Sequence, residues 1–267
     1  GFANGAGHGA TFRDHWGNYW HVSTISISVK NNFERRIGIW PAGFDREGVM
    51  YCSQAFGDYP TWLPTGPANH LESRFTGWML LNYKKPVQVS SSLGGFPANN
   101  AVDENIKTYW SAQTGEASEW FQTDLGNLST VRAIQINYAD QDAEFLGKPE
   151  GVFHRYQILE SKDGRKWNLL VDKSRNTTDE PHDYVELEKP VLTRFLKLVN
   201  LQMPSGKFAL SGLRVFGTGA GEIPGPVRGF VVLRTAKDKR SAWLKWQQVP
   251  DAYGYVIHMG TEPSKLY

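Results

Sequence analysis

This chain of 267 residues contains a single cysteine, Cys52, so no disulfide can form within it. Its formal net charge is only +2, which is too small to indicate a nucleic-acid partner. No apolar run reaches the length of a membrane-spanning helix. The sequence also lacks a persuasive Ser/His/Asp, Cys/His or glycine-rich phosphate motif. These absences exclude several common classes of enzyme and of membrane protein from the interpretation.

What the chain does contain is aromatic residues, glycine and proline. Phe, Trp and Tyr make up 13% of the residues, ten of them tryptophans, and there are 27 glycines and 14 prolines. This mixture favours short strands joined by turns, so the predicted fold class is all-β. Most of the rings are expected in the core, but exposed rings suit sugar binding, because a ring face packs on the apolar C–H face of a pyranose.

The first piece, residues 1–85, is predicted to be one four-stranded antiparallel sheet of the kind that forms a β-propeller blade. A lone blade cannot bury both of its faces, so we expect neighbouring blades outside this chain. Gly1 is not an initiator methionine, and we therefore expect the chain to be cut from a longer protein. The predicted strands are Ala10–Asp14, Tyr19–Ser26, Arg36–Trp40 and Gly48–Ser53.

Within this piece, the segments 7–14 (GHGATFRD), 19–21 (YWH) and 57–60 (GDYP) carry a resemblance. Together they resemble the last blade of family 43 glycoside hydrolases, five-bladed propellers that cleave arabinosides and xylosides. The resemblance implies that His8 lies at the central axis of a propeller, beside the active site. The alternative interpretation of His8 is a histidine that is satisfied within a turn.

The middle piece, residues 86–217, alternates strands and turns and shows no convincing amphipathic helix. Apolar and polar residues alternate with period two in several segments, which predicts about eight strands in a jelly-roll sandwich. The clearest of these segments are Val131–Tyr138, Arg155–Ser161, Tyr184–Leu187 and Arg194–Val199.

A short polar run in this piece predicts a cation loop. Asp103, Asn105 and Thr108 place a carboxylate, an amide oxygen and a hydroxyl within six residues. Oxygen ligands at such spacing suit a hard cation held in a tight loop.

Four segments, 100–110, 120–126, 156–167 and 208–217, together resemble a discoidin or F5/8 type C domain. In bacterial enzymes such a domain is similar to a family 32 carbohydrate-binding module, with a galactose-binding-like fold. The resemblance implies a structural Ca²⁺, but Gly212 stands where the family has a glutamate, and the missing charge should weaken binding. The alternative is a cation-free turn capped by Asp103. The implied ligands are Asn100, Asp103, Asn105, Thr108 and Ser211.

Sugar-binding members of that family hold their ligands in loops at one end of the sandwich. The corresponding loops here are 111–118, 139–154, 173–182 and 203–208. Their candidate hydrogen-bonding and stacking groups could also be solvated loop side chains, or the loops could pack against the first piece. The candidates are Gln113, Asp140, Asp142, Phe145, His154, Lys207 and Phe208.

Residues 218–226 are rich in glycine and proline and are predicted to be a linker. After it, residues 228–234, 242–246 and 254–258 are predicted strands. Residues 227–267 resemble the first half of a fibronectin type III domain, and this resemblance implies that Trp246 is its core tryptophan. We expect that domain to be cut short.

Glycosidases need two carboxyl groups flanking the scissile bond. Asp14, Asp45, Glu47 and Asp58 each lie near a predicted turn, where acidic residues usually serve the turn itself. We therefore expect no catalytic residue in this chain, and no activity from it alone.

The whole pattern predicts the C-terminal part of a multimodular bacterial glycoside hydrolase that is secreted, periplasmic or cell-surface. Its expected partners are a plant-type polysaccharide of arabinosides or xylosides and the missing N-terminal propeller blades, with no nucleic acid. Two alternatives remain: a non-enzymatic adhesion protein, whose membrane-binding spike would be Phe145–Leu146, and a structural spacer without a ligand.

Overall fold

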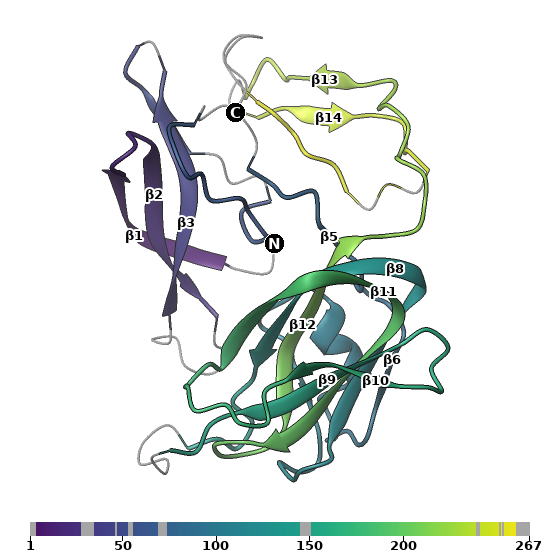
Figure 1. Cartoon of the computed structure of the whole chain (residues 1–267). Coiled ribbons are helices and arrows are strands. Elements are labelled where there is room, and N and C mark those ends of the chain that lie inside the picture. Colours follow the sequence, from purple (N-terminus) through teal and green to yellow (C-terminus); the bar gives the residue numbers. More distant parts are fainter. Residues whose placement is uncertain are drawn as a thin grey trace. The chain divides into compact units, whose positions relative to one another are not determined.

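The computed structural model describes residues 4–27, 35–45, 47–52, 56–68, 74–144, 151–238, 241–250, 252 and 254–259 (Figure 1). Strands dominate these residues, and the only helix among them is a short 3-10 helix, η1 (Ala98–Val102). No helix in the described residues is long and apolar enough to cross a membrane. The chain divides into two compact units, Gly1–Ala220 and Gly221–Tyr267.

The N-terminal sheet is a meander in which each strand pairs antiparallel with the next. The prediction of four antiparallel strands is confirmed, although the first and third are longer than expected and Ser53 lies outside the described residues. The strands are β1 (Asn4–Arg13), β2 (Tyr19–Ser26), β3 (Arg35–Phe44) and β4 (Met50–Cys52).

Asp14 fixes the turn between β1 and β2, as predicted. Its carboxylate accepts hydrogen bonds from the backbone amides of Trp16 and Asn18 at 3.0 and 2.8 Å. Burial alone would raise the pKa of Asp14, but hydrogen bonds from the Trp20 and Asn18 side chains and these amides hold it at about 2. The carboxylate is therefore used by the turn, as is that of Asp45, which accepts from the amides of Glu47 and Val49.

One face of this sheet exposes large apolar side chains. Strand periodicity places Phe12, Ile37 and Ile39 on the same face, since Phe12 aligns with Trp20 and Trp20 with Pro41. The three side chains are 44%, 76% and 45% exposed. Trp20 on the same face is 5% exposed with the Arg74 guanidinium over its ring, so within the described residues the face is covered at Trp20 and open at Phe12, Ile37 and Ile39.

The second part of the same unit is a jelly-roll sandwich, as predicted, in which two long bent strands belong to both layers (Figure 1). The early part of β8 and the late part of β11 join β6, β9 and β10 in one layer. Their other halves join β12, β5 and β7 in the second layer. The strands are β5 (Met79–Leu80), β6 (Val87–Val89), β7 (Trp110–Ser111), β8 (Trp120–Tyr138), β9 (Arg155–Ser161), β10 (Asn168–Asp172), β11 (His182–Gln202) and β12 (Ala209–Thr218).

The core of the sandwich lies between these layers. Phe121 and Ile158 enter it from the first layer, and Ile134 and Val215 from the second, each at most 2% exposed. Trp110 is fully buried and its ring contacts those of Phe121 and Phe208. The alternation seen in the sequence thus produces a closed hydrophobic core, while β12 is buried on both faces, with Arg214 and Phe216 on its outer side against residues 58–59.

In the C-terminal unit, β13 (Val231–Leu233) pairs antiparallel with β14 (Trp243–Lys245). The prediction of a third strand over residues 254–258 is wrong, because this segment is described without strand pairing. Trp246 is half-buried and packs edge-on against Tyr255, with ring centroids 5.0 Å apart. A sheet of two three-residue strands has a short edge for a third strand to pair with. The segment 254–258 instead contacts the unit through the Tyr255 ring.

Candidate functional site

Three of the four predicted loops meet at one end of the sandwich. The backbone amide of Phe208 donates to the Thr114 carbonyl at 2.9 Å, which joins the loops 203–208 and 111–118. The amide of Lys207 donates to the Gln141 carbonyl at 2.9 Å and so joins the loop 139–154. The prediction that these loops lie together is confirmed, and their relative positions are set by backbone hydrogen bonds.

Two glycines allow this close approach. A Cβ on Gly115 would lie 2.1 Å from the Gly206 carbonyl oxygen, and one on Gly206 would lie 2.5 Å from that of Gln141. Gly206 also has a φ of +72°, which favours glycine. The loops therefore cross at backbone contact distance, a geometry that larger residues would disrupt.

A polar array runs over the surface of these loops. The Lys207 ammonium lies 3.0 Å from a carboxylate oxygen of Asp142, and the Gln141 amide donates to the other oxygen at 2.7 Å. The Tyr109 hydroxyl in turn donates to the Gln141 side-chain oxygen at 2.6 Å. Asp142 is 55% exposed and Lys207 26%, so the outer end of the array faces solvent while the inner end is buried.

Two other predicted residues belong to the same loops. Gln113 is exposed, and its backbone amide donates to the Ser91 hydroxyl at 2.9 Å. Asp140 is half-buried beside the array. Phe145, together with the predicted spike 145–146, lies outside the described residues.

Phe208 and His154 are corrections to the predicted site. Phe208 is 0% exposed and its ring packs against Trp110 and Tyr138, so it is part of the core and cannot be a stacking face. His154 is 7% exposed and stacks on Tyr138 with ring centroids 4.0 Å apart. Both residues lie at the ends of loops, but their rings point into the sandwich, where burial of apolar ring surface is favourable.

The fourth predicted loop, 173–182, joins the others through His154. The Asn176 side-chain amide donates to the His154 carbonyl at 3.0 Å. Lys173 lies 3.2 Å from Asp183 and 3.5 Å from Glu180. Burial acts to lower the pKa of Lys173, but the two carboxylates outweigh it and the pKa is raised. Sequence reasoning did not single out Lys173 and Asp183, although they stand at the two ends of this loop, because their ion pair depends on how the loop folds back.

The predicted cation loop closes on itself through Asp103. One carboxylate oxygen accepts the Asn105 amide hydrogen at 2.8 Å and the other accepts the Thr108 hydroxyl hydrogen at 2.7 Å. Ser211 lies at a bulge of β12, buried beside Asn137, and the Asn100 side-chain amide donates to the Tyr109 carbonyl at 3.0 Å.

Oxygen atoms of this kind are the ligands that a hard cation prefers, and a carboxylate oxygen that accepts one hydrogen bond still has a lone pair for the cation. Asp103 supplies the single formal charge of the predicted set, and the described residues contain no group of three or more His, Cys, Asp or Glu arranged to hold a metal. Calcium at this loop stays a prediction, and the cation-free turn remains its alternative.

A buried ion pair stands beside this loop and was not foreseen. The Arg214 guanidinium, 2% exposed, binds both carboxylate oxygens of Glu104 at 2.9 Å. It also donates to the Asp58 carbonyl at 2.6 Å and lies over the Tyr59 ring. Burial raises the pKa of Glu104, and the Arg214 charge opposes that rise. This pair connects the sandwich to the segment that follows the N-terminal sheet.

His8 lies on β1, is exposed and has a φ of +50°. A left-handed φ at a residue other than glycine is uncommon and often marks a functional position. The predicted place of His8 at a propeller axis is not tested by the described residues and stays a prediction.

Comparison with known proteins identifies the sandwich. The family model of the F5/8 type C domain matches residues 86–212. Lactadherin from Sus scrofa is 30% identical over 118 residues, a match that covers 41% of this chain and 28% of lactadherin. The chain spans about a quarter of the length of the curated relatives it matches.

Among solved structures, chitosan-binding module 1 of a chitosanase/glucanase from Paenibacillus sp. IK-5 is 21% identical. That match covers 52% of this chain and 99% of the module, with a TM-score of 0.43. A protein described as a glycoside hydrolase is 20% identical, and its match covers 80% of this chain and 47% of that protein, with a TM-score of 0.40. On the strength of the family match and the jelly-roll topology, residues 86–212 form an F5/8 type C domain.

Proposed function

We propose that the F5/8 type C domain binds carbohydrate at the loop end of the sandwich. The observation that carries this proposal is the polar array of Lys207, Asp142 and Gln141, which lies on two of the three loops that are hydrogen-bonded to one another. A carboxylate beside an ammonium offers an acceptor and a donor to adjacent sugar hydroxyls. A few fixed polar groups of this kind are what orient a ligand in a shallow site.

Preorganisation strengthens the argument. The Tyr109 hydroxyl is buried and fixes the Gln141 amide, which in turn fixes Asp142. Ligand binding then orders fewer side chains, and the entropic cost of binding falls accordingly. We infer that the loop end is built to present Asp142 and Lys207 in one arrangement.

We further propose that the chain is the C-terminal part of a multimodular, secreted, periplasmic or cell-surface bacterial glycoside hydrolase acting on arabinoside- or xyloside-type plant polysaccharide. The apolar face of Phe12, Ile37 and Ile39 supports this, because such a face requires a neighbouring sheet such as the next propeller blade. The resemblance of residues 7–14, 19–21 and 57–60 to the last blade of family 43 hydrolases supports the choice of substrate class.

The test is calorimetric titration of the whole chain with arabinosyl-substituted xylo-oligosaccharides. Asp142→Asn and Lys207→Met should each weaken binding about tenfold, the loss expected for one charge-assisted hydrogen bond. Lys189→Met is the matched control, since this exposed lysine lies on β11 away from the loops. Binding equal in the control and in both loop variants would contradict the proposed site.

A second candidate function is that of a structural spacer without a ligand. The buried Arg214 favours it, because one guanidinium bonds Glu104 of the sandwich and the Asp58 carbonyl outside it. If no glycan binds, and Arg214→Met speeds the hydrogen exchange of backbone amides in the N-terminal sheet, the structural spacer is the better account.

A further inference from the structure

The outer face of the first sandwich layer carries a straight row of side chains across five strands. The strand registers align Gln88 of β6 with Gln122 of β8, Gln122 with Lys197 of β11, Lys197 with Leu159 of β9, and Leu159 with Leu169 of β10. At the usual strand spacing such a row spans about 19 Å. This face is separate from the loop end, and nothing in the proposed function uses it.

Lys197 stands at the centre of the row between two tryptophans. Its ammonium lies 4.1 Å from the centroid of the Trp167 ring and 4.7 Å from that of Trp120. Burial against these rings lowers the pKa of Lys197. Among the described residues, no carboxylate oxygen lies within ion-pair distance of this ammonium. A half-desolvated cation held by two rings would be stabilised by an anion from outside.

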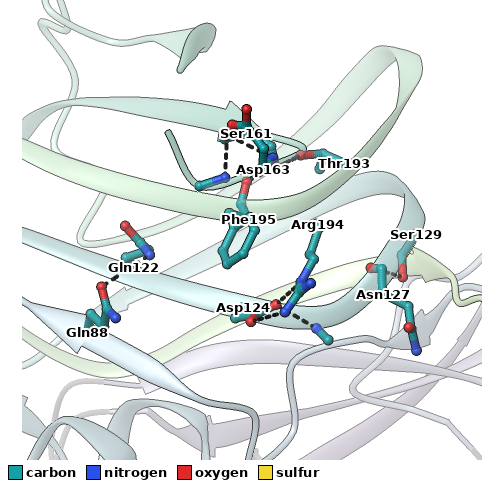
Figure 2. A network of polar contacts seen from close by, with 12 residues as sticks. Gln88, Gln122, Asp124, Asn127, Ser129, Ser161, Asp163, Thr193, Arg194 and Phe195 are labelled. Atoms are coloured by element: carbon teal, nitrogen blue, oxygen red, sulfur yellow. Dashed lines mark hydrogen bonds and ion pairs between the residues drawn. The ribbon is translucent and has the colours of Figure 1, made fainter. Parts of the chain in front are cut away.

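The nearby carboxylates are already occupied. Arg194 binds Asp124 through two hydrogen bonds of 2.7 Å, as Figure 2 shows. Asp163 accepts the backbone amides of Arg165 and Lys166 in the turn between β9 and β10. The free charges of that turn are therefore basic, and together with Lys197 they favour a negatively charged ligand.

The amides in the row add hydrogen-bonding capacity. Gln122, which is 8% exposed, donates to the side-chain oxygen of Gln88 over a long 3.5 Å, so the exposed Gln88 keeps both of its donors for a ligand (Figure 2). An exposed amide in the same row as a cation suits a chain of hydroxyl groups laid flat on a sheet. Leu169, at the far end of the row, is 54% exposed and adds apolar area beside these groups.

We propose that this outer face is a second ligand surface, which binds an acidic polysaccharide with a hexuronate carboxylate on Lys197. Trp120 and Trp167 flank the charged sugar, and Gln88 binds a hydroxyl of a neighbouring sugar. A neutral glycan would leave the ammonium without its partner, so the surface selects for the charge.

The experiment is titration of the whole chain with polygalacturonate and with its methyl-esterified form, which differs in charge at the carboxyl group. Wild-type protein should bind the acid form, and added salt should weaken that binding. Lys197→Met should weaken it by about tenfold or more, and Lys197→Arg, which keeps the charge, should weaken it less. Lys189→Met on the same strand should bind like the wild type.

Three outcomes would overturn the proposal: equal weakening by Lys197→Met and Lys189→Met, equal affinity for the esterified polymer, or equally tight binding of dextran sulfate. An unchanged thermal midpoint in Lys197→Met, or retained binding in Lys197→Arg, excludes misfolding as the cause of a loss. Asp142→Asn should not alter this binding, so failure here and failure of the loop site are distinguishable.

Discussion

The N-terminal sheet and the sandwich use their apolar residues in opposite ways. In the sandwich, Trp110, Phe121 and Ile134 are at most 1% exposed between two layers. In the sheet, Ile37 and Ile39 are 76% and 45% exposed on a face that the described residues leave open. Similar strand patterns in the sequence thus give one domain that closes its own core and one sheet that leaves large apolar side chains exposed.

This difference explains why the sandwich can carry a binding site by itself. Two long strands, β8 and β11, cross both of its layers and fix the loops at their ends. The N-terminal sheet has a single layer of four strands.

The largest expected effect is in the core of the sandwich. Trp110→Ala should lower the free energy of unfolding by about 3–5 kcal/mol, because it leaves a cavity among buried rings. Ile37→Ala should change it by about 0.5 kcal/mol or less, since that side chain is largely exposed already. Urea unfolding followed by tryptophan fluorescence measures both, and losses of similar size would remove the distinction between the two regions.

The second effect concerns the joint between the regions. Arg214→Met should lower stability by about 3 kcal/mol, because it leaves the Glu104 carboxylate buried without its partner. Adding Glu104→Gln should recover part of that loss, since the uncompensated charge is then removed. A double variant as unstable as the single one would show that the pair acts through shape rather than charge.

Much of this fold could be predicted from the sequence, because strand alternation is a local signal. Residues 131–138, 155–161 and 194–199 all lie in strands of the sandwich, and the turn chemistry of Asp14 was evident from its position. The sequence did not reveal that residues 120–138 form one bent strand. Nor did it show that β5 extends the sandwich sheet before residue 86, which depends on pairing with β12.

The third effect is at the predicted cation loop. Asp103→Ala removes two hydrogen bonds that close the turn and should cost about 1 kcal/mol in the absence of any cation. If calcium binds, chelator should lower the thermal midpoint of the wild type but not that of the variant. Should chelator leave the wild type unchanged while the variant is still less stable, the cation-free turn is the correct account.

The smallest effect is a pH dependence at the surface of the sandwich. The hydrogen bond from Arg194 is the largest cause that lowers the pKa of Asp124 below its ordinary value of 3.8. A lowered carboxyl pKa stabilises the fold above the ordinary value, and this stability is lost as the pH falls through the folded-state pKa. Because the pair is partly exposed, we expect a contribution of about 0.5 kcal/mol.

Thermal melts of wild type and Asp124→Asn between pH 6 and pH 2.5 measure this contribution. The variant should be less stable at pH 6, and the difference should shrink toward the acid end. A difference that grows as the pH falls would give the opposite sign and reject the pair as its source.

The candidate site was less predictable than the fold. The loops were identified by their position between strands, and Asp142 and Lys207 do meet on them. Phe208 and His154 were misplaced, because burial of a ring at a loop end depends on the core beneath it. Lys197 and its two tryptophans come from three separate strands or turns, and only the sheet register brings them together.

The most direct test of carbohydrate binding at the loop end is mapping of backbone amide chemical shifts. The whole chain would be titrated with a neutral arabinosyl-substituted xylo-oligosaccharide. Our account predicts that the shifted amides cluster in residues 111–118, 139–144 and 203–208, with Asp142 and Lys207 among the largest. Shifts confined to the β1–β4 sheet, or none at millimolar ligand, would contradict it.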